Sequence, residues 1–488
     1  MNVLFVTLDQ FRADSLGAAG SRHVHTPTLD RIARDGIRLA RHFSQAAPCS
    51  PGRAAIYTGT YQMNNRVVAN GTPLAERFDN IARVARRAGY TPVLFGYTDQ
   101  GLDPQSATGP YDPRLDDYDG VLPGFELGLH LPESQAPWVE WLRGLGFDVP
   151  YGWAAALRGE PDRPAEFSLT NFLTDRFLAW HARQDAPWFA HLSYLRPHPP
   201  YAAAGEFSRR VDPADVDLPI PPAPADRRHP LHDAFLAHPQ ASAPPTEAEI
   251  RHLRAQYYGM IDEVDASLAR VVDALVTSGQ WDDTLVIITS DHGDQLGDHG
   301  LIEKLGYFPQ SYHVLGLWRD PRRPGGLVID RFTENVDLMP SLALALGLEA
   351  PRQCDGRTLQ ELFDGTAREW RRAVHYEWDY RSWFIGARTP QWPYDRRLSR
   401  DNLAVSFDGS TAYVQFGDGS YRCYDTAADP SWRTEVSDTE RAFGSARELL
   451  QWRQEHLQRD MTDMLLRSDR PGHWPGAPAP TRAPTSRS

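Results

Sequence analysis

Short apolar runs alternate along this chain with longer segments in which apolar residues recur at helical spacing. Runs of this kind, bounded by polar or turn residues, are typical of buried strands, and they cover residues 3 to 8, 92 to 96, 188 to 194 and 284 to 289. Residues 246 to 277 have the periodicity of an amphipathic helix. Residues 26 to 36 predict a short helix that Thr26 caps. Strands that alternate with helices indicate an α/β fold with a mostly parallel sheet.

The pattern changes near residue 400. Three short strands are predicted at residues 403 to 407, 411 to 416 and 421 to 424, separated by Asp-Gly-Ser and Gly-Asp-Gly turns, and a helix follows at 439 to 466. We therefore expect a catalytic α/β domain over residues 1 to 395, a small antiparallel sheet with a helix over 396 to 466, and an extended tail over 467 to 488.

Composition narrows the class of protein. The chain has 488 residues, 24% of them charged, and a net charge of −13, which argues against a nucleic-acid partner. Three cysteines do not make a disulfide framework and favour a reducing, cytoplasmic location. The first apolar run is too short to cross a membrane, so we expect no membrane association.

Polar residues follow two of the predicted strands. Asp9-Gln10 ends one strand and Asp291-His292 ends another, and strand ends are where chemistry collects in α/β sheets. Oxygen and imidazole ligands suit a divalent cation. Asp9 alone is equally well explained as a turn or cap residue. The dense polar segment from Asp291 to Lys304 is harder to explain in that way.

Cys49 lies where a loop becomes a helix. Pro51 suits a first helical turn, and Ala54-Ala55-Ile56-Tyr57 continue it. A lone cysteine is most often a buried structural residue. At a helix start, however, it faces free amides and the positive end of the dipole, which suits an anion or an anionic nucleophile.

Cys49-Ser50-Pro51-Gly52-Arg53 resembles the C-x-P-x-R signature of type I sulfatases and of the related phosphonate monoester hydrolases. The resemblance covers nearly the whole chain. In order, it includes the segments Leu8-Asp9-Gln10, Gly96-Tyr97-Thr98, Arg196-Pro197-His198-Pro199-Pro200, Thr289 to Gly293, Gly297-Asp298-His299 with Lys304, and Val336 to Pro340. It implies an alkaline-phosphatase-like fold, with a central sheet flanked by helices and a smaller C-terminal sheet.

The resemblance also implies cofactors. A separate formylglycine-generating enzyme would oxidise Cys49 to formylglycine, whose hydrate carries two hydroxyls: one attacks the ester and the other expels the product. One divalent metal ion is implied, with Mn²⁺ or Ca²⁺ favoured and Mg²⁺ or Zn²⁺ left open. The implied metal ligands are Asp9, Gln10, Asp291, His292 and residue 49.

Further roles follow from the same resemblance. Arg53 is expected to hold the residue 49 hydrate, and Lys304 to donate either to a non-bridging oxygen or to the leaving oxygen of the ester. His198 corresponds to the histidine near the leaving group, while Asn70 and Tyr97 correspond to polar contacts of the transferred group.

Gln10 and Tyr97 stand where typical sulfatases carry an aspartate and a lysine, and in this they resemble phosphonate monoester hydrolases. We therefore expect hydrolysis of small, singly charged esters, phosphonate monoesters or phosphodiesters, with promiscuous sulfate ester hydrolysis. An arylsulfatase is the alternative. Asp99 departs from the pattern, because a carboxylate near an anionic substrate is unfavourable unless it points away or binds a cationic leaving group.

Two other readings are weaker. A binding protein on this fold would have lost ligands, yet every motif position is chemically competent. A phosphatase with a Ser or Thr nucleophile would leave the signature without a purpose. The aromatic residues Tyr376, Trp378, Tyr380 and Trp383 predict either a leaving-group pocket or packing in a core or an oligomer. Relatives associate, so a homodimer or homotetramer is expected.

Overall fold

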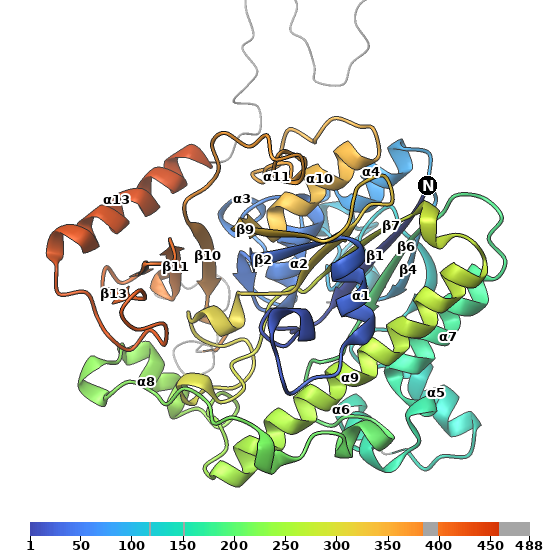
Figure 1. Ribbon diagram of the computed structural model, residues 1–488, viewed down its shortest axis with the longest axis horizontal. Helices are drawn as coiled ribbons and strands as arrows, with labels where there is room; N and C mark the ends of the chain where they lie inside the picture. Colours follow the sequence, from blue (N-terminus) through green and yellow to red (C-terminus); the bar gives the residue numbers. More distant parts are fainter. Residues whose placement is uncertain (117–118, 150–151, 384–398, 458–488) are drawn as a thin grey trace, which may run out of the picture.

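The computed structural model describes residues 1–116, 119–149, 152–383 and 399–457, and these form two sheets surrounded by helices (Figure 1). The larger, eight-stranded sheet consists of β1 (Asn2–Leu8), β2 (Ile37–Phe43), β4 (Pro92–Gly96), β5 (Glu126–His130), β6 (Phe189–Tyr194), β7 (Thr284–Thr289), β8 (Gly316–Arg319) and β9 (Leu327–Glu334). Its strand order is β5-β4-β6-β1-β7-β8-β2-β9. Only β8 runs antiparallel to its neighbours in this sheet, so the predicted mostly parallel sheet is confirmed.

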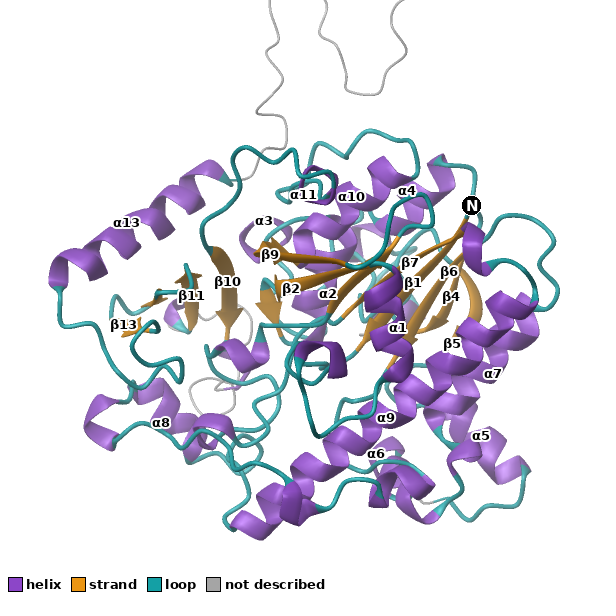
Figure 2. Cartoon of the chain, in the orientation of Figure 1, coloured by secondary structure: helices purple, strands orange, loops and turns teal. Residues whose placement is uncertain are grey.

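Helices cover both faces of the larger sheet (Figure 2). Strand β1 shows why, since Leu4, Val6 and Leu8 belong to one apolar core and Val3 and Phe5 to the other. The first core includes residues of α1 (Pro27–Asp35), α5 (Ala136–Gly144), α6 (Trp153–Arg158), α7 (Leu169–His181) and α9 (Glu247–Thr277). The second includes residues of α2 (Cys49–Thr58), α4 (Ile81–Arg87), α10 (Leu338–Ala345) and α11 (Gln360–Phe363). The remaining short helices are α3 (Gln62–Asn65) and α8 (Pro230–Leu236).

The smaller sheet has five strands in the order β13-β12-β11-β10-β3. They are β3 (Ala46–Ala47), β10 (Val374–Asp379), β11 (Asn402–Phe407), β12 (Thr411–Phe416) and β13 (Tyr421–Asp425). The strands from β10 to β13 pair antiparallel, which confirms the predicted meander, while β3 pairs parallel with β10. Two strands of this sheet thus come from before residue 396. The proposed division of the chain at that residue stays a prediction, and the tail at 467 to 488 lies outside the described residues.

Helix α13 (Thr439–Glu455) packs against the smaller sheet and is shorter than predicted. It ends where His456 leaves the helical conformation, with φ −112° and ψ 16°, and the His456 Nδ1 atom lies 2.8 Å from the carbonyl of Trp452. The prediction that it continues to residue 466 is wrong at 456 and 457, and the rest of that stretch lies outside the described residues. Tyr376, Trp378 and Tyr380 are buried in the core of this sheet.

The start of α1 differs from the prediction in its cap. Thr26 occupies the N-cap position, but its side chain accepts a hydrogen bond from Gly17 N instead of from the helix. The free amides of Thr28 and Leu29 are bonded to the carboxylate of Asp265 on α9, at 3.1 and 2.8 Å. A tertiary contact therefore supplies the cap that was assigned to a local residue.

The register of the central strands determines where polar residues meet. β1 lies between β6 and β7, with Leu8 opposite Tyr194 and Thr7 opposite both Ser193 and Thr289. Parallel strands end at the same edge. The segments after β1, β4, β6 and β7, which carry all the predicted site residues except Cys49, Arg53 and Asn70, therefore emerge together.

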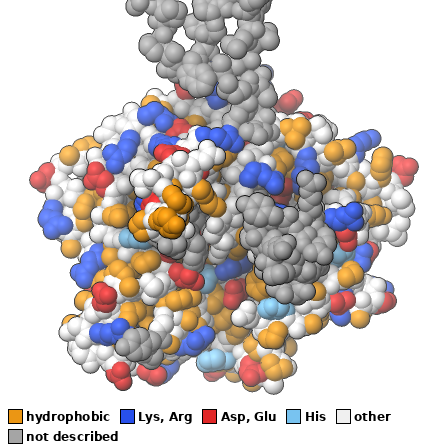
Figure 3. Space-filling model, turned by 180° about the vertical axis from the view of Figure 1, so that it is seen from behind, with side chains coloured by type: hydrophobic (Ala, Val, Ile, Leu, Met, Phe, Trp, Pro, Cys, Tyr) orange, Lys and Arg blue, Asp and Glu red, His pale blue; other side chains and the backbone are white. Residues whose placement is uncertain are grey.

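The surface is mixed in character. On the side shown in Figure 3, acidic, basic and hydrophobic side chains are interspersed over the described part of the face. Across the described residues, no helix combines the length and the apolar character needed to span a bilayer.

Candidate active site

Four side chains that could hold a metal ion meet at the carboxyl edge of the larger sheet. Ligand atoms of Asp9, Cys49, Asp291 and His292 all lie within 4.8 Å of one another, and all four residues are buried. Cys49 Sγ is 3.2 Å from His292 Nε2 and 3.9 Å from Asp9 Oδ1. Burial and the neighbouring carboxylate of Asp9 raise the pKa of Asp291, so this pair of carboxylates favours a nearby positive charge.

Gln10 completes the donor set that a cation would need. Its Nε2 donates to Asp294 Oδ2 at 2.6 Å, and because a carboxylate can only accept, this contact fixes the orientation of the amide. Its Oε1 is buried without a hydrogen-bond partner among the described residues. A buried carbonyl oxygen left without a partner costs free energy unless a ligand satisfies it. This donor set of oxygen, imidazole and residue 49 fits a divalent cation.

Arg53, on α2, joins the two carboxylates. Its Nη2 donates to Asp9 and its Nε donates to Asp291, both at 3.0 Å, and its side chain is fully buried. Tyr97 donates to the same Asp9 oxygen at 2.6 Å, and the guanidinium lies 4.1 Å from its ring centroid. Both residues therefore orient Asp9. Ser193, on β6, accepts from Arg53 Nη1 at 2.8 Å.

Cys49 is the first residue of α2, as the sequence predicted. The next amide, Ser50 N, donates to Asn70 Oδ1 at 3.0 Å, and the Ser50 carbonyl accepts from Gln100 Nε2 at 3.0 Å. These contacts fix the turn that presents residue 49. Burial and the carboxylate of Asp9 raise the pKa of the Cys49 thiol well above its ordinary value.

Lys304 is the single lysine of the sequence, and it lies beside His198. Lys304 Nζ is 2.9 Å from His198 Nε2, while His198 Nδ1 is 2.7 Å from the carbonyl of Pro199. A carbonyl only accepts, so Nδ1 carries the proton and Nε2 accepts from the lysine. Burial and the adjacent ammonium lower the pKa of His198 to about 4. Burial opposes the charge of Lys304, but the acidic groups around it raise its pKa above the ordinary value.

A cavity of about 290 Å³ opens over residue 49. Asp9, Cys49, Asn70, Tyr97, His198 and Lys304 line it. So do acidic residues that no predicted role explains, namely Asp99, Asp119, Glu133 and Glu303. Burial raises the pKa of Asp99 to about 7. The cavity therefore places both cationic and acidic groups around any bound molecule.

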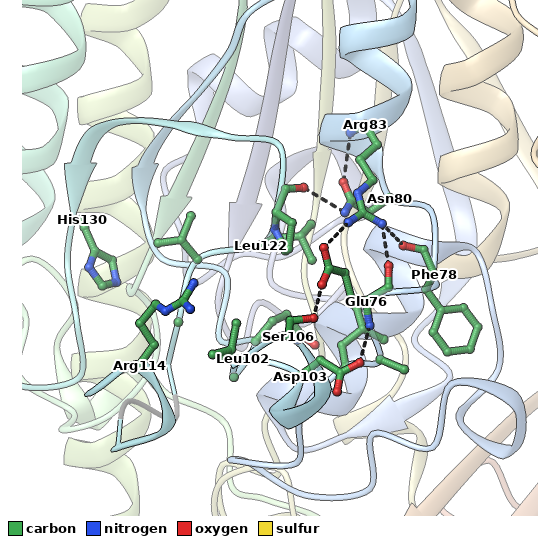
Figure 4. Close-up of a pocket in the computed structure, with 17 residues that line it drawn as sticks. Glu76, Phe78, Asn80, Arg83, Leu102, Asp103, Ser106, Arg114, Leu122 and His130 are labelled. Carbon is green, nitrogen blue, oxygen red and sulfur yellow. Dashed lines mark hydrogen bonds and ion pairs between the residues drawn. The ribbon is translucent and has the colours of Figure 1, made fainter. Parts of the chain in front are cut away.

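A second, larger cavity of about 510 Å³ is shown in Figure 4. Many of its polar groups bind one another: Arg83 and Ser106 both contact the carboxylate of Glu76, whose backbone N–H donates to Asp103. None of the described residues that line it belongs to the group of Asp9, Cys49, Asp291 and His292 or to the signature segment. The chemistry therefore belongs to the smaller cavity.

The structure brings every predicted site residue to one edge of the sheet. It also adds residues whose function the sequence analysis did not identify. Asp294 belongs to the polar segment noted after β7, but its contact with Gln10 depends on strand pairing across 284 positions of chain. Ser193 lies within an apolar strand, and nothing local indicates its contact with Arg53.

This edge of the sheet carries a buried group of side chains that could hold a metal ion, and the family and structural matches identify the chain as a hydrolase of ester bonds. The chain belongs to the sulfatase family, whose model matches residues 1–348.

Individual relatives cover almost the whole chain. It is 36% identical to the multifunctional alkaline phosphatase superfamily protein PehA of Trinickia caryophylli, over 94% of this chain and 96% of that protein. The solved phosphonate monoester hydrolase of Agrobacterium radiobacter is 37% identical, with a TM-score of 0.85 over 96% of this chain and 98% of that one. That of Silicibacter pomeroyi is 34% identical, with the same TM-score and coverage.

Proposed function

We propose that this protein hydrolyses singly charged esters, with phosphonate monoesters or phosphodiesters as its main substrates and sulfate esters as secondary ones. The observation that carries the proposal is the position of two residues at the centre of the site: Gln10, whose amide is bonded to Asp294, and Tyr97, which donates to Asp9. Compared with the residues of typical sulfatases, Gln10 removes one negative ligand and Tyr97 removes one positive charge. The similarity to two phosphonate monoester hydrolases also favours phosphonate monoesters or phosphodiesters over sulfate esters as the main substrates.

We further propose that Cys49 is converted to formylglycine and that one divalent cation is held by Asp9, Gln10, Asp291, His292 and residue 49. Such a cation would lower the pKa of a hydroxyl nucleophile and offset the charge of the ester. The hydrate of the aldehyde provides one hydroxyl for attack and a second whose deprotonation releases the product.

The other site residues orient the carboxylates and helix α2, or interact with the charge of the transferred group. Arg53 holds the two carboxylates in place, and Lys304 supplies a hydrogen-bond donor to an oxygen of the transferred group. His198 accepts from Lys304 and so directs the ammonium into the cavity. Asn70 fixes the start of α2 through Ser50.

The proposal is tested with p-nitrophenyl sulfate, phenyl p-nitrophenylphosphonate and bis-p-nitrophenyl phosphate as parallel substrates. We expect kcat/KM to be highest for the phosphonate or the diester. A higher kcat/KM for the sulfate would identify an arylsulfatase instead. Mass analysis of the peptide containing residue 49 is expected to show a loss of about 18 daltons relative to cysteine. An unmodified cysteine in fully active protein would overturn the formylglycine assignment.

Replacing Lys304 tests the donor role. Lys304→Ala is expected to lower kcat about a hundredfold or more, because it removes a donor aimed at developing charge. Lys304→Arg is the matched variant, since it keeps the charge but changes the shape of the donor. Metal content and the mass at residue 49 are measured in both. An unchanged kcat in Lys304→Ala would remove the residue from the mechanism.

A further inference from the structure

The cavity over residue 49 shares a wall with the larger cavity of Figure 4. Three pairs of consecutive residues form this wall, and one member of each pair lines each cavity. Asp99, Asp119 and Leu131 line the cavity over residue 49, and Gln100, Gly120 and His130 line the larger cavity. Consecutive residues are about 3.8 Å apart, so the two cavities are close neighbours at all three points. A molecule bound in the larger cavity would therefore contact the back of a wall whose front faces residue 49.

Hydrogen bonds join the three segments of the shared wall. The Thr98 Oγ1 atom donates to the carbonyl of Gly120 at 2.9 Å and accepts from the amide of Leu122 at 2.8 Å. The amide of Leu131 donates to the carbonyl of Gly96 at 2.8 Å. Because these bonds hold the segments together, a shift of one segment also displaces the others.

Gln100 connects the larger cavity to the turn that presents residue 49. Its side chain is 3% exposed, and its Nε2 atom donates to the carbonyl of Ser50 at 3.0 Å. A carbonyl only accepts, so the other atom of the amide is the oxygen. This Oε1 atom is buried without a partner among the described residues, and so is His130 Nε2 in the same wall. A hydrogen-bond donor on a ligand in the larger cavity would satisfy the oxygen.

The rest of the larger cavity favours a neutral and largely apolar ligand. Its volume of about 510 Å³ suits a small molecule. Its apolar lining includes Leu74, Phe78, Leu102, Val121, Leu122 and Pro123 (Figure 4). Its charged groups already have partners: Arg83 pairs with Glu76 at 3.3 Å, and Arg114 pairs with Asp112 at 2.6 Å. The carboxylate of Asp103 accepts from two backbone amides. A charged ligand would therefore find no free counter-charge among the described residues that line this cavity.

We propose that the larger cavity is an effector site for a neutral, apolar alcohol or phenol, whose hydroxyl donates to Gln100 Oε1. The bound ligand keeps the amide in the orientation in which Nε2 holds the Ser50 carbonyl, and so it keeps residue 49 in place. Occupancy of the site raises kcat/KM. The hydrolysis of an ester releases an alcohol or a phenol, so in this respect the inference rests on the proposed function, whose reaction forms ligands of this class.

Calorimetric titration with 2-naphthol tests the site without turnover. The control compound is 2-methylnaphthalene, which has the same shape without the hydroxyl and is the more apolar of the two. We expect 2-naphthol to bind at least about threefold more tightly, because only its hydroxyl satisfies Gln100 Oε1. The absence of 2-naphthol binding, or equal affinity for the two compounds, would overturn the proposal.

Two variants locate the bound compound. Leu102→Trp and Val121→Phe enlarge apolar side chains that line the larger cavity, and both are expected to weaken 2-naphthol binding at least about tenfold. Leu145→Trp changes an exposed leucine outside the cavity and is the matched control, with the wild-type affinity expected. Basal kcat/KM is expected to be unchanged in all three variants. Wild-type affinity in both cavity variants would overturn the proposal, because the compound would then be bound elsewhere.

Steady-state kinetics test the coupling between the two cavities, with the best of the three p-nitrophenyl substrates. Saturating 2-naphthol is expected to raise kcat/KM at least about twofold in the wild type and in Leu145→Trp, but not in Leu102→Trp. An unchanged or lowered kcat/KM in the wild type, or an equal rise in Leu102→Trp, would overturn the coupling. Binding that Leu102→Trp abolishes, without hydrolysis of any substrate, would support the site and count against the proposed function.

Discussion

The amide of Gln10 is oriented by Asp294, which also accepts from Tyr201 at 2.9 Å. Asp294→Ala is expected to weaken the binding of a divalent metal about 10- to 100-fold, because Gln10 Oε1 would lose its fixed direction. The metal affinity of Asp294→Asn is expected to lie between those of the wild type and Asp294→Ala, since the amide oxygen of the asparagine can still accept from Gln10. Titration of metal-free protein with Mn²⁺ measures the effect. Equal affinity in all three proteins would show that Asp294 does not position Gln10.

At the scale of single residues, the sequence predicted the site residues that directly follow strands or belong to the C-x-P-x-R signature. Asp9, Cys49 and Asp291 were identified because their local context is unusual, and the structure brings them together. Asp99 was noted as a departure, but its place in the cavity wall depends on a left-handed backbone that no local residue pattern indicates. The contacts that orient Gln10 and Arg53 come from distant segments, so they could not be predicted.

Helix α2 approaches the end of β7 so closely that Gly52 has no room for a side chain. A Cβ atom there would lie 2.5 Å from the carbonyl oxygen of Asp291 and 3.1 Å from that of Ala46. Gly52→Ala is therefore expected to displace Cys49 from Asp291 and to lower kcat/KM at least about tenfold, together with Tm.

The matched control is Gly144→Ala. Gly144 is the last residue of α5, and nothing lies within 4 Å of an added Cβ. Alanine there is expected to stabilise the protein by up to about 1 kcal/mol and to leave kcat/KM unchanged. Equal kcat/KM in both variants would contradict the close approach of α2 to β7.

Helix α9 carries a buried carboxyl group that makes stability depend on pH. Burial and the nearby charge of Glu160 raise the pKa of Glu263 from 4.5 to about 7. Between these two values the folded protein binds more protons than the unfolded chain, so stability falls as pH rises, by roughly 3 kcal/mol at most. Glu263→Gln removes this dependence.

Thermal unfolding at pH 5 and pH 8 measures the effect. The fall in Tm between these values is expected to be smaller in Glu263→Gln than in the wild type. Glu140→Gln, which changes an exposed carboxylate on α5, should keep the wild-type difference. If Glu263→Gln behaves like this control, the buried carboxyl group does not contribute to the pH dependence.

At the scale of elements, the prediction succeeded where the signal is local. The strand at 284 to 289 and the helix that ends at 277 match β7 and α9, because apolar pattern and polar ends agree there. The predicted cap of α1 was wrong because the carboxylate of Asp265, on α9, accepts from the first amides of the helix in place of the Thr26 side chain. The predicted end of α13 was wrong because the backbone leaves the helical conformation at His456.

The smaller sheet reaches the site through β3, its edge strand, which directly precedes α2. Ala46 and Ala47 of β3 pair with Glu377 and Trp378 of β10, two residues before Cys49. Trp378 is 1% exposed and stacks on Phe235. Trp378→Ala is expected to cost about 3–5 kcal/mol through the cavity it leaves. Because β3 leads directly into Cys49, activity should also be lost at a lower urea concentration.

Activity and far-UV circular dichroism are followed together in urea. Their midpoints are expected to shift downward by the same amount in Trp378→Ala. Activity that persists after most of the dichroism signal is lost would show that the smaller sheet unfolds independently of the site. The sequence did not predict this link, because β3 has only two residues.

The position of β1 between β6 and β7 has a consequence for biosynthesis. Gln10 and Asp291, which meet at the ends of β1 and β7, are 281 residues apart. At ~5–20 residues per second, a ribosome needs roughly 15–60 s to make the intervening chain. During this delay the central strand lacks β7, and until Tyr194 has been made it also lacks β6, while residue 49 is still outside the interior that later encloses it. A modifying enzyme would have that interval in which to reach the thiol, and a chaperone would have the same interval in which to shield an apolar strand.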